Sequence, residues 1–271
     1  MVNIINNLFS LKGKTIILVG STGYLGTSIA KAISDAEGEM ILVGRSAKRL
    51  KSQIDALPNS KKLTCHLFEL DITDDNAEIR LRQFLEENFG KLHGIVNNAY
   101  SGVVGNLHSI TEAHFDTAYK YNITKPFLIF KEMMPLLART AAEDETSVSI
   151  VNVASMYGVV SPDPSIYGES GKNNPIHYGA SKAGMIQMSR YLACHAGRDN
   201  IRVNSVSPGA FPNRDVDSGI NKFIESLEAK VPMQRVGRQD EIGGPIVFLL
   251  SEASSYISGA NIPIDGGWTA W

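Results

Sequence analysis

Cysteine is scarce in this sequence, and histidine is sparse. The chain has only Cys65 and Cys194, each within a predicted regular element, so we expect no disulfide framework and two buried, unreactive thiols. Its six histidines lie apart, without the spacing of metal ligands, so no metal site is expected.

An excess of charge is also lacking. Lysine and arginine number 26 against 28 aspartates and glutamates, a net charge of -2, so we expect no nucleic-acid partner and no basic membrane face. No run of about 18 apolar residues is present that could span a bilayer, and the start of the chain does not resemble a secretory signal. These absences predict a cytoplasmic protein that acts on a small molecule.

What the sequence does contain is a regular alternation of predicted strands and helices. Apolar, β-branched runs predict the strands, and runs with helical spacing lie between them. The alternation predicts an α/β fold, a Rossmann-type doubly wound parallel sheet of about seven strands in the order 3-2-1-4-5-6-7 with helices on both faces. We expect residues 1–271 to form a single domain. The predicted strands are residues 15–19, 40–43, 63–70, 94–99, 147–155, 201–207 and 261–264.

A glycine-rich turn, Gly20-Ser-Thr-Gly23-Tyr-Leu-Gly26, joins the first strand to a helix. Glycines there let backbone amides approach a pyrophosphate at the positive end of the helix, although a tight turn without a ligand gives the same pattern. The second strand ends in Gly44-Arg45, where an NAD-binding protein usually has a carboxylate. An arginine there can hold a 2′-phosphate, which favours NADP as the cofactor, with NAD possible.

Tyr178 and Lys182 lie four residues apart at the start of a predicted helix, so they share one face. An ammonium held near a phenol favours the phenolate and lowers its pKa towards the range useful for proton transfer. The spacing alone is more typical of an ordinary surface pair. The surroundings favour the chemical interpretation, because the glycine-rich turn, Asn98 and Ser155 follow strand ends, which gather at one edge of a parallel sheet.

Pro126 lies within a run of helical spacing that follows the helix predicted from the capping-box pattern Ser109-Ile-Thr-Glu112. A proline has no amide hydrogen, so the carbonyl of Asn122 loses its expected donor and is free for a water; a simple kink is the alternative.

Two segments are predicted to cover the edge of the sheet at which the strands end. Residues 159–177 are rich in proline and form a long loop, which is usually functional. Tyr157, Tyr167 and Asn173-Asn174 offer stacking and hydrogen bonds to a polyhydroxylated substrate, although a structural lid is an equal alternative. Residues 211–232 are predicted to form a mobile flap over the site.

These motifs resemble the short-chain dehydrogenase/reductase family over essentially the whole chain. The resemblance implies that Tyr178 is the general acid/base, that Lys182 holds the nicotinamide ribose and lowers the pKa of the tyrosine, and that Ser155 positions the carbonyl. It also implies that Asn122 maintains a water-linked proton relay. The residues that carry the resemblance are the glycine-rich turn, Asn97-Asn98-Ala99, Asn122, Ser155, Tyr178-x-x-x-Lys182, Pro208-Gly209 and Asp265-Gly-Gly267.

The same resemblance implies the remaining contacts and the assembly. We expect a homo-oligomer, a tetramer or dimer, formed through the helices that start near Asn122 and Tyr178. Candidate substrate residues are Tyr100, Tyr157, Tyr167 and Phe211. Candidate cofactor residues are Gly20, Ser21, Thr22, Tyr24, Leu25, Gly26, Arg45, Asp71, Ile72, Asn98, Ala99, Tyr178, Lys182, Pro208, Gly209 and Phe211.

The chain also departs from the family pattern. Tyr100 replaces the glycine that commonly follows Asn-Asn-Ala, and Asn213 stands where a threonine often contacts the cofactor. The expected function is an NADP(H)-preferring oxidoreductase that interconverts a secondary alcohol and a ketone on a sugar-like or other polar small molecule, with some similarity to bacterial members associated with surface-sugar and nonulosonate biosynthesis. The alternatives are a cofactor-recycling sugar-nucleotide epimerase or dehydratase, suggested by the glycine spacing, and a non-catalytic NADP-binding sensor or scaffold.

Overall fold

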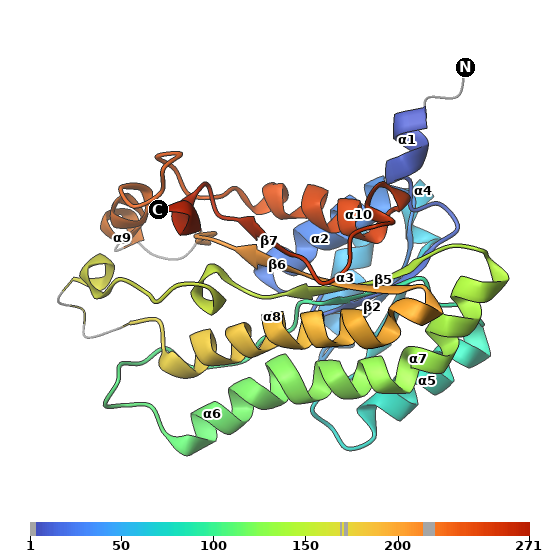
Figure 1. Ribbon diagram of the computed structural model, residues 1–271, viewed down its shortest axis with the longest axis horizontal. Helices are drawn as coiled ribbons and strands as arrows, with labels where there is room; N and C mark the ends of the chain where they lie inside the picture. The colour runs from blue at the N-terminus through green and yellow to red at the C-terminus, as the bar shows by residue number, and fades with distance from the viewer. Residues whose placement is uncertain (1–3, 169, 171–172, 214–219) are drawn as a thin grey trace.

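Seven parallel strands form one sheet in the order β3-β2-β1-β4-β5-β6-β7 in the computed structural model, which confirms the predicted topology (Figure 1). The structure describes residues 4–168, 170, 173–213 and 220–271. The strands are β1 Thr15–Val19, β2 Glu39–Gly44, β3 Cys65–Glu69, β4 Gly94–Asn97, β5 Val148–Val153, β6 Ile201–Pro208 and β7 Asn261–Ile264.

Helices cover both faces of the sheet. In Figure 1, α2 and α10 lie above it, and α5, α7 and α8 lie below it. The helices are α1 Ile4–Phe9, α2 Tyr24–Asp35, α3 Ala47–Asp55, α4 Asn59–Lys62, α5 Ala77–Asn88, α6 Glu112–Tyr119, α7 Lys125–Glu143, α8 Ile176–Ala196, α9 Ile220–Glu228 and α10 Gly243–Leu250. Among the described residues, no helix is long and apolar enough to cross a membrane.

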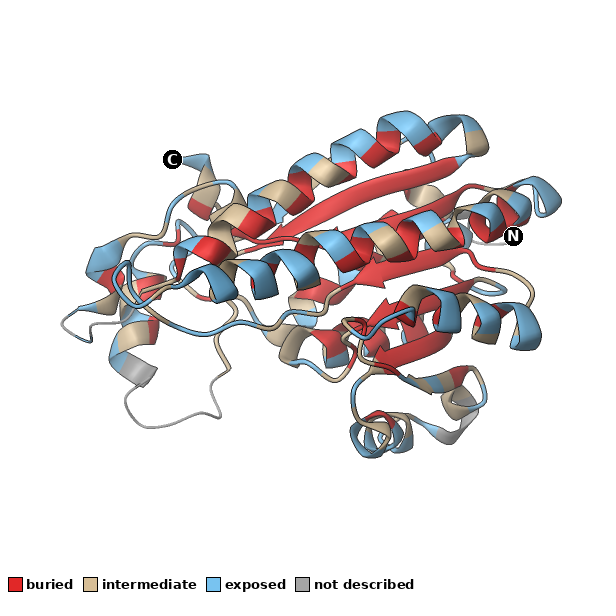
Figure 2. Ribbon diagram, turned by 90° about the horizontal axis from the view of Figure 1, so that it is seen from below, coloured by how far each residue is buried: buried red, intermediate tan, exposed pale blue. Residues whose placement is uncertain are grey.

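The central strands are rich in apolar residues because they are buried on both faces, although β5 and β6 also bury polar side chains such as those of Asn152 and Arg202. Every residue of β1, β4, β5 and β6 is buried, and Figure 2 shows the sheet as the continuous buried layer beneath helices with exposed outer faces. A parallel sheet covered on both sides requires such runs, which is why these strands were predictable. The sheet thereby fixes the position of the loops that follow its carboxyl ends.

Several local expectations differ from the structure. The predicted loop 159–177 contains a short helix, Pro164–Tyr167, and ends early because α8 begins at Ile176. The predicted capping box at Ser109 is instead formed by Thr111 and His114, with α6 beginning one residue after Thr111. Within the predicted flap, Ile220–Glu228 form helix α9, and residues 214–219 lie outside the described residues.

Two further differences concern Cys194 and helix α3. Cys65 is buried as expected, but Cys194 is exposed, because it lies on the outer face of α8. Helix α3 was not predicted, since Leu50 is its only buried residue and its other positions carry little apolar pattern.

Candidate active site

The turn after β1 and the end of β4 touch through their backbones. Gly20 has a positive φ of 79°, and a Cβ atom on it would lie 2.6 Å from the Cα of Ala99. The side-chain amide of Asn98 donates to the main-chain carbonyl of Gly20 over 2.9 Å. Only glycine permits both the conformation and this approach. The predicted cofactor residues of the two strand ends are therefore brought together.

The glycine-rich turn has the form of a nucleotide cradle. A Cβ on Gly26 would lie 2.3 Å from the carbonyl oxygen of Gly20, so α2 packs directly on the turn. Gly23 precedes α2, no side chain caps that helix end, and a Cβ on Gly23 would find no atom nearer than 3.4 Å. The hydroxyl of Ser21 is buried without a partner among the described residues. A helix that begins after a glycine, which has no capping side chain, leaves backbone amides for the pyrophosphate of a dinucleotide.

The other predicted residues of the turn have structural contacts as well. The hydroxyl of Tyr24 donates to the carbonyl of Pro212 over 3.1 Å, which ties the turn to the start of the predicted flap. Thr22 lies at the surface side of the turn, and Leu25 packs against the core layer formed with α10. These contacts position the turn relative to the segment after β6.

Arg45 lies exposed at the end of β2, with Asp71 facing it from the end of β3. Burial raises the pKa of Asp71, but hydrogen bonds from Thr73 and the charge of Arg45 outweigh burial and leave that pKa below its usual value. The hydroxyl and the amide of Thr73 both donate to Asp71, at 2.7 and 2.9 Å. Ile72 is buried behind this pair. A cation is therefore present where a 2′-phosphate would need one.

Sequence reasoning missed two residues of α3. Arg49 donates to the carbonyl of Thr22 over 2.8 Å, and Gln53 donates to the carbonyl of Ser21 over 3.0 Å. The two side chains lie four positions apart and share a helix face, so α3 holds the glycine-rich turn from outside. The same four-residue spacing after Ser46, which caps the helix, could have indicated their role.

The paired asparagines at the end of β4 have different partners. The amide of Asn97 donates to Asn152 on β5 over 2.8 Å, and the amide of Asn152 donates to Ser189 on α8 over 2.8 Å. This buried chain links the two central strands to the helix that carries Tyr178.

Ser155 and Tyr178 meet across a contact made possible by two glycines. A Cβ on Gly158 would lie 2.8 Å from the backbone of Lys182, and one on Gly179 would lie 2.8 Å from the carbonyl of Tyr157. The turn after β5 therefore packs on the backbone of α8, and the side chain of Ser155 reaches hydrogen-bonding distance of the Tyr178 hydroxyl.

Lys182 shares the face of Tyr178 as predicted, but its tip does not reach the phenol. Its Nζ donates to the carbonyl of Val153 over 2.6 Å and lies 5.8 Å from the centre of the Tyr178 ring. Burial lowers the pKa of Lys182 to about 7. Burial likewise raises the pKa of Tyr178, and the hydrogen bond from Ser155 offsets this only in part. In the protein alone, Lys182 is not among the causes that shift the pKa of Tyr178, and burial is the largest of them.

Asn122 lies in the predicted helix defect. Residues Lys120–Thr124 form a π-helical turn, and α7 begins directly after it with Pro126 in its first turn. The amide of Asn122 donates to Ser181 over 2.9 Å, and Ser181 donates to the carbonyl of Tyr178. The side-chain oxygen of Asn122 is buried and has no partner among the described residues. The wider turn accommodates the proline and leaves a buried acceptor that a water could satisfy.

The candidate substrate residues form two groups. Tyr100 lies edge-on to Tyr178, with ring centroids 4.9 Å apart. Tyr157 and Tyr167 are hydrogen-bonded to each other, and burial together with this bond raises the pKa of Tyr157. The ring of Tyr167 lies 5.6 Å from that of Phe223 on α9. The hydrogen-bonded pair of Tyr157 and Tyr167 therefore joins the turn after β5 to the long loop.

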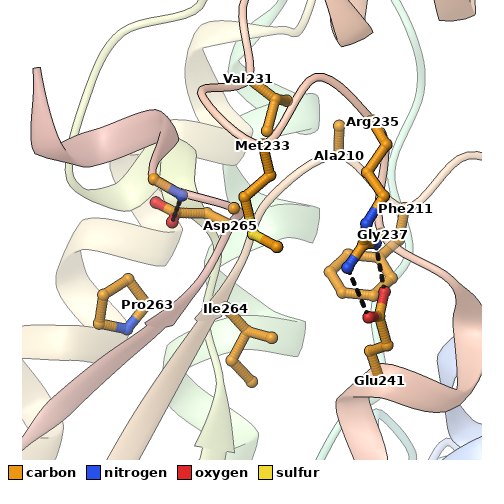
Figure 3. Close-up of a pocket in the computed structure, with 12 residues that line it drawn as sticks. Ala210, Phe211, Val231, Met233, Arg235, Gly237, Glu241, Pro263, Ile264 and Asp265 are labelled. Atoms are coloured by element: carbon orange, nitrogen blue, oxygen red, sulfur yellow. Dashed lines mark hydrogen bonds and ion pairs between the residues drawn. The ribbon is translucent and has the colours of Figure 1, made fainter.

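Phe211 lies apart from the four predicted catalytic residues. It follows Pro208-Gly209, where the amide of Gly209 donates to the carbonyl of Ile264 over 2.9 Å, and its ring packs on Gly237. Figure 3 shows the ring in a cavity of about 530 Å³ beside the ion pair of Arg235 and Glu241. None of the four predicted catalytic residues lines this cavity. Within the described parts of the chain, no group of three or more acidic, histidine or cysteine side chains has a geometry that could hold a metal ion.

A family model described as enoyl-(acyl carrier protein) reductase matches residues 21–269 of this chain. The chain is 29% identical over 262 residues to the rhamnolipids biosynthesis 3-oxoacyl-(acyl-carrier-protein) reductase of Pseudomonas aeruginosa, covering 96% of this chain and 98% of that protein. It is 28% identical over 291 residues to the ribulose-forming D-arabinitol 2-dehydrogenase of Scheffersomyces stipitis, covering 99% and 98%.

Solved structures agree in fold over the same length. The complex of RhlG with NADP from Pseudomonas aeruginosa superposes with a TM-score of 0.86 at 29% identity, covering 97% of this chain and 99% of that one. A short chain dehydrogenase from Leptospira borgpetersenii with bound NAD⁺ superposes with a TM-score of 0.84 at 26% identity, covering 99% and 97%.

The buried lysine predicts a pH-dependent stability. Between about pH 7 and the unfolded pKa of 10.5, the unfolded chain holds a proton on Lys182 that the folded chain releases, so stability rises with pH across this window. Below about pH 7, Lys182 is protonated in both the folded and the unfolded chain, and burial of its charge destabilises the folded chain to the full extent. We expect Lys182→Met to unfold in urea with a free energy about 1–4 kcal/mol above that of the unmutated protein near pH 6.5. This advantage should shrink towards pH 10.

The exposed Lys131→Met is the matched control, and its difference from the unmutated protein should not change with pH. An advantage of Lys182→Met that stays constant over the same pH range would contradict the assignment.

Proposed function

The chain belongs to the short-chain dehydrogenase/reductase family, and on this premise we propose that it is an NADP(H)-preferring oxidoreductase that interconverts a secondary alcohol and a ketone on a polar, sugar-like small molecule. The observation that carries the proposal is the group of Ser155, Tyr178 and Lys182, with Ser155 hydrogen-bonded to Tyr178, at the sheet edge where the glycine-rich turn also lies. A proton donor and a dinucleotide cradle at one sheet edge are what this reaction needs.

The cofactor would be held by residues of four strand ends. Backbone groups of the glycine-rich turn would bind the pyrophosphate, and Arg45 would bind the 2′-phosphate. Asn98 and Ala99 would border the ribose, and Pro208-Gly209 would border the nicotinamide. When bound, NADPH supplies the hydride. The relatives that support this cofactor include a structure with NADP and one with NAD⁺.

The protein's own part of the reaction is a proton transfer. Tyr178 would donate its hydroxyl proton to the oxygen of the forming alkoxide, and Ser155 would hold the same oxygen through a second hydrogen bond. Because burial keeps the pKa of Tyr178 above its usual value, the phenol is protonated at neutral pH and ready to act as an acid. Lys182 would hold the nicotinamide ribose, and Asn122 would support a water that returns the proton.

The polar substrate is supported by the groups that border Tyr178. The hydroxyls of Tyr157 and Tyr167 lie on the side of the long loop, and the side-chain oxygen of Asn174 is buried without a partner among the described residues. Buried polar groups need partners, and the hydroxyls of a keto-sugar or polyol would supply them. The similarity to an arabinitol dehydrogenase points in the same direction.

A second candidate substrate is a 3-oxoacyl thioester. It is favoured by the exposed apolar side chains of Val103, Val104 and Leu107 on the loop after β4, and by the similarity to a 3-oxoacyl reductase. NADPH absorbance with a panel of keto-sugars, simple ketones and acyl-thioester ketones would separate the two candidates.

The surrounding organisation is part of the proposal. One continuous sheet supports a single dinucleotide-binding and catalytic domain over residues 1–271. We also propose a cytoplasmic homo-oligomer, a dimer or tetramer, in which α7 and α8 form an interface. Exposed Phe127 and Tyr191 on these helices support it.

Replacing Tyr178 tests the proton transfer. Tyr178→Phe keeps the ring and its packing but removes the proton, so kcat for ketone reduction should fall by about 10²–10⁴-fold. NADPH affinity, measured by the fluorescence of the bound nicotinamide, should stay within about two-fold because the phenol is not needed to hold the dinucleotide. Unchanged turnover in this variant would rule out Tyr178 as the acid.

Arg45 tests the cofactor preference. Losing a charge-assisted contact with the 2′-phosphate should lower kcat/KM for NADPH by about 10–100-fold in Arg45→Ala, with NADH little affected. The exposed Arg198→Ala removes a cation on the far side of the sheet and should change neither value. A preference of the unmutated protein for NADH would overturn the assignment of Arg45.

A further inference from the structure

We propose that Tyr100, lying over Gly102, forms an aromatic gate above Tyr178 that limits the size of the group a substrate carries beside its carbonyl. The inference rests on the proposed ketone reduction and names the determinant of its steric selectivity. The gate distinguishes this chain from the family pattern, because Tyr100 stands where the family commonly has a glycine.

The gate contacts the proposed proton donor directly. The rings of Tyr100 and Tyr178 lie 4.9 Å apart at an interplanar angle of 78°, an edge-to-face arrangement that is favourable for aromatic pairs. The ammonium of Lys182 lies 5.9 Å from the centre of the Tyr100 ring and 5.8 Å from that of Tyr178. At these distances one cation attracts both rings. Tyr100 is therefore held against the reacting pair and does not point away from it.

Gly102 makes this position possible. A Cβ atom at residue 102 would lie 2.0 Å from the hydroxyl oxygen of Tyr100 and 2.6 Å from the ring carbon that bears it. The phenol thus occupies the space that any other residue at position 102 would fill. Because the clash involves only the far end of a side chain, an alanine there would displace Tyr100 without disturbing the backbone.

The base of the gate is fixed on both sides. On one side, Asn98 and Ala99 are locked against Gly20, so Tyr100 leaves a rigid strand end. On the other, Gly105 pairs with Asn173 in an antiparallel bridge, which joins the loop after β4 to the long loop before α8. With both ends anchored, the backbone that carries Tyr100 is fixed, and the space over Gly102 decides where its ring lies.

The chemical consequence concerns one of the two substituents of a ketone. A ketone oxygen that reaches both Ser155 and Tyr178 must place one substituent on the side that Tyr100 covers. The exposed fraction of Tyr100, 40%, shows that this side opens to solvent beyond the ring, so removing the ring would join the site to open space. The hydroxymethyl group of an α-hydroxy ketone would be held by the tyrosine hydroxyls on the side of the long loop, which leaves the other substituent beneath the ring. We expect a methyl group to fit there and a branched or aromatic group to be excluded.

Two α-hydroxy ketones that differ only in that substituent provide the test: hydroxyacetone and 2-hydroxyacetophenone. With NADPH, the unmutated protein should favour hydroxyacetone in kcat/KM. Tyr100→Ala and Gly102→Ala should each shift the ratio of the two kcat/KM values by about ten-fold or more towards the phenyl ketone. Tyr100→Phe keeps the ring and should retain the original ratio. A binding measurement without turnover, calorimetry of 1-phenyl-1,2-ethanediol with the NADPH-loaded protein, should show the same gain in both alanine variants.

Gly197→Ala is the matched glycine control, because a Cβ at that position meets no atom within 4 Å, and its ratio should equal that of the unmutated protein. An unchanged ratio in both Tyr100→Ala and Gly102→Ala, with both ketones still reduced, would overturn the gate and leave the proposed function intact. Failure of the unmutated protein to reduce either ketone or any member of the wider panel, despite binding NADPH, would overturn the proposed function and the gate with it.

Discussion

The close approach of Gly20 to Ala99 is the contact on which the rest of the site depends. A side chain on Gly20 would overlap the backbone of Ala99, so the turn after β1 and the end of β4 can meet only because a glycine is present. The contact sets the position of Asn98 on one side and of Tyr100 on the other. The residues proposed to bind the dinucleotide and the residue proposed to limit the substrate are therefore consecutive in one fixed segment.

Two further glycines permit a close backbone approach at the end of β5. Gly158 and Gly179 let the turn after β5 pack on α8, which brings Ser155 to Tyr178. Burial then governs the charge of the group: it keeps the phenol protonated and lowers the pKa of Lys182 to about 7. The protein alone thus prepares an acid, which suits reduction of a ketone, and α8 positions both groups from one helix face.

The sequence allowed the sheet and the reacting residues to be predicted for different reasons. Strands buried on both faces are rich in apolar residues, so their number and their alternation with helices were accessible, and the shared face of Tyr178 and Lys182 follows from helical spacing. Three features depend on tertiary contacts and were not accessible. Helix α3 buries only one of its residues, the tip of Lys182 turns to Val153, and Tyr100 fills the space over Gly102 through a contact that no local pattern reveals.

The most direct test of the central claim, reversible hydride exchange with a carbonyl assisted by Tyr178, is the fate of an isotope. Purified protein would be given a ketone that it accepts and NADPH carrying deuterium at the transferred position of the nicotinamide, and the product would be examined by NMR. The account predicts one deuterium at the new carbinol carbon for each NADPH oxidised. A product formed without net NADPH oxidation, as a cofactor-recycling epimerase or dehydratase would give, or a product without deuterium, would contradict it.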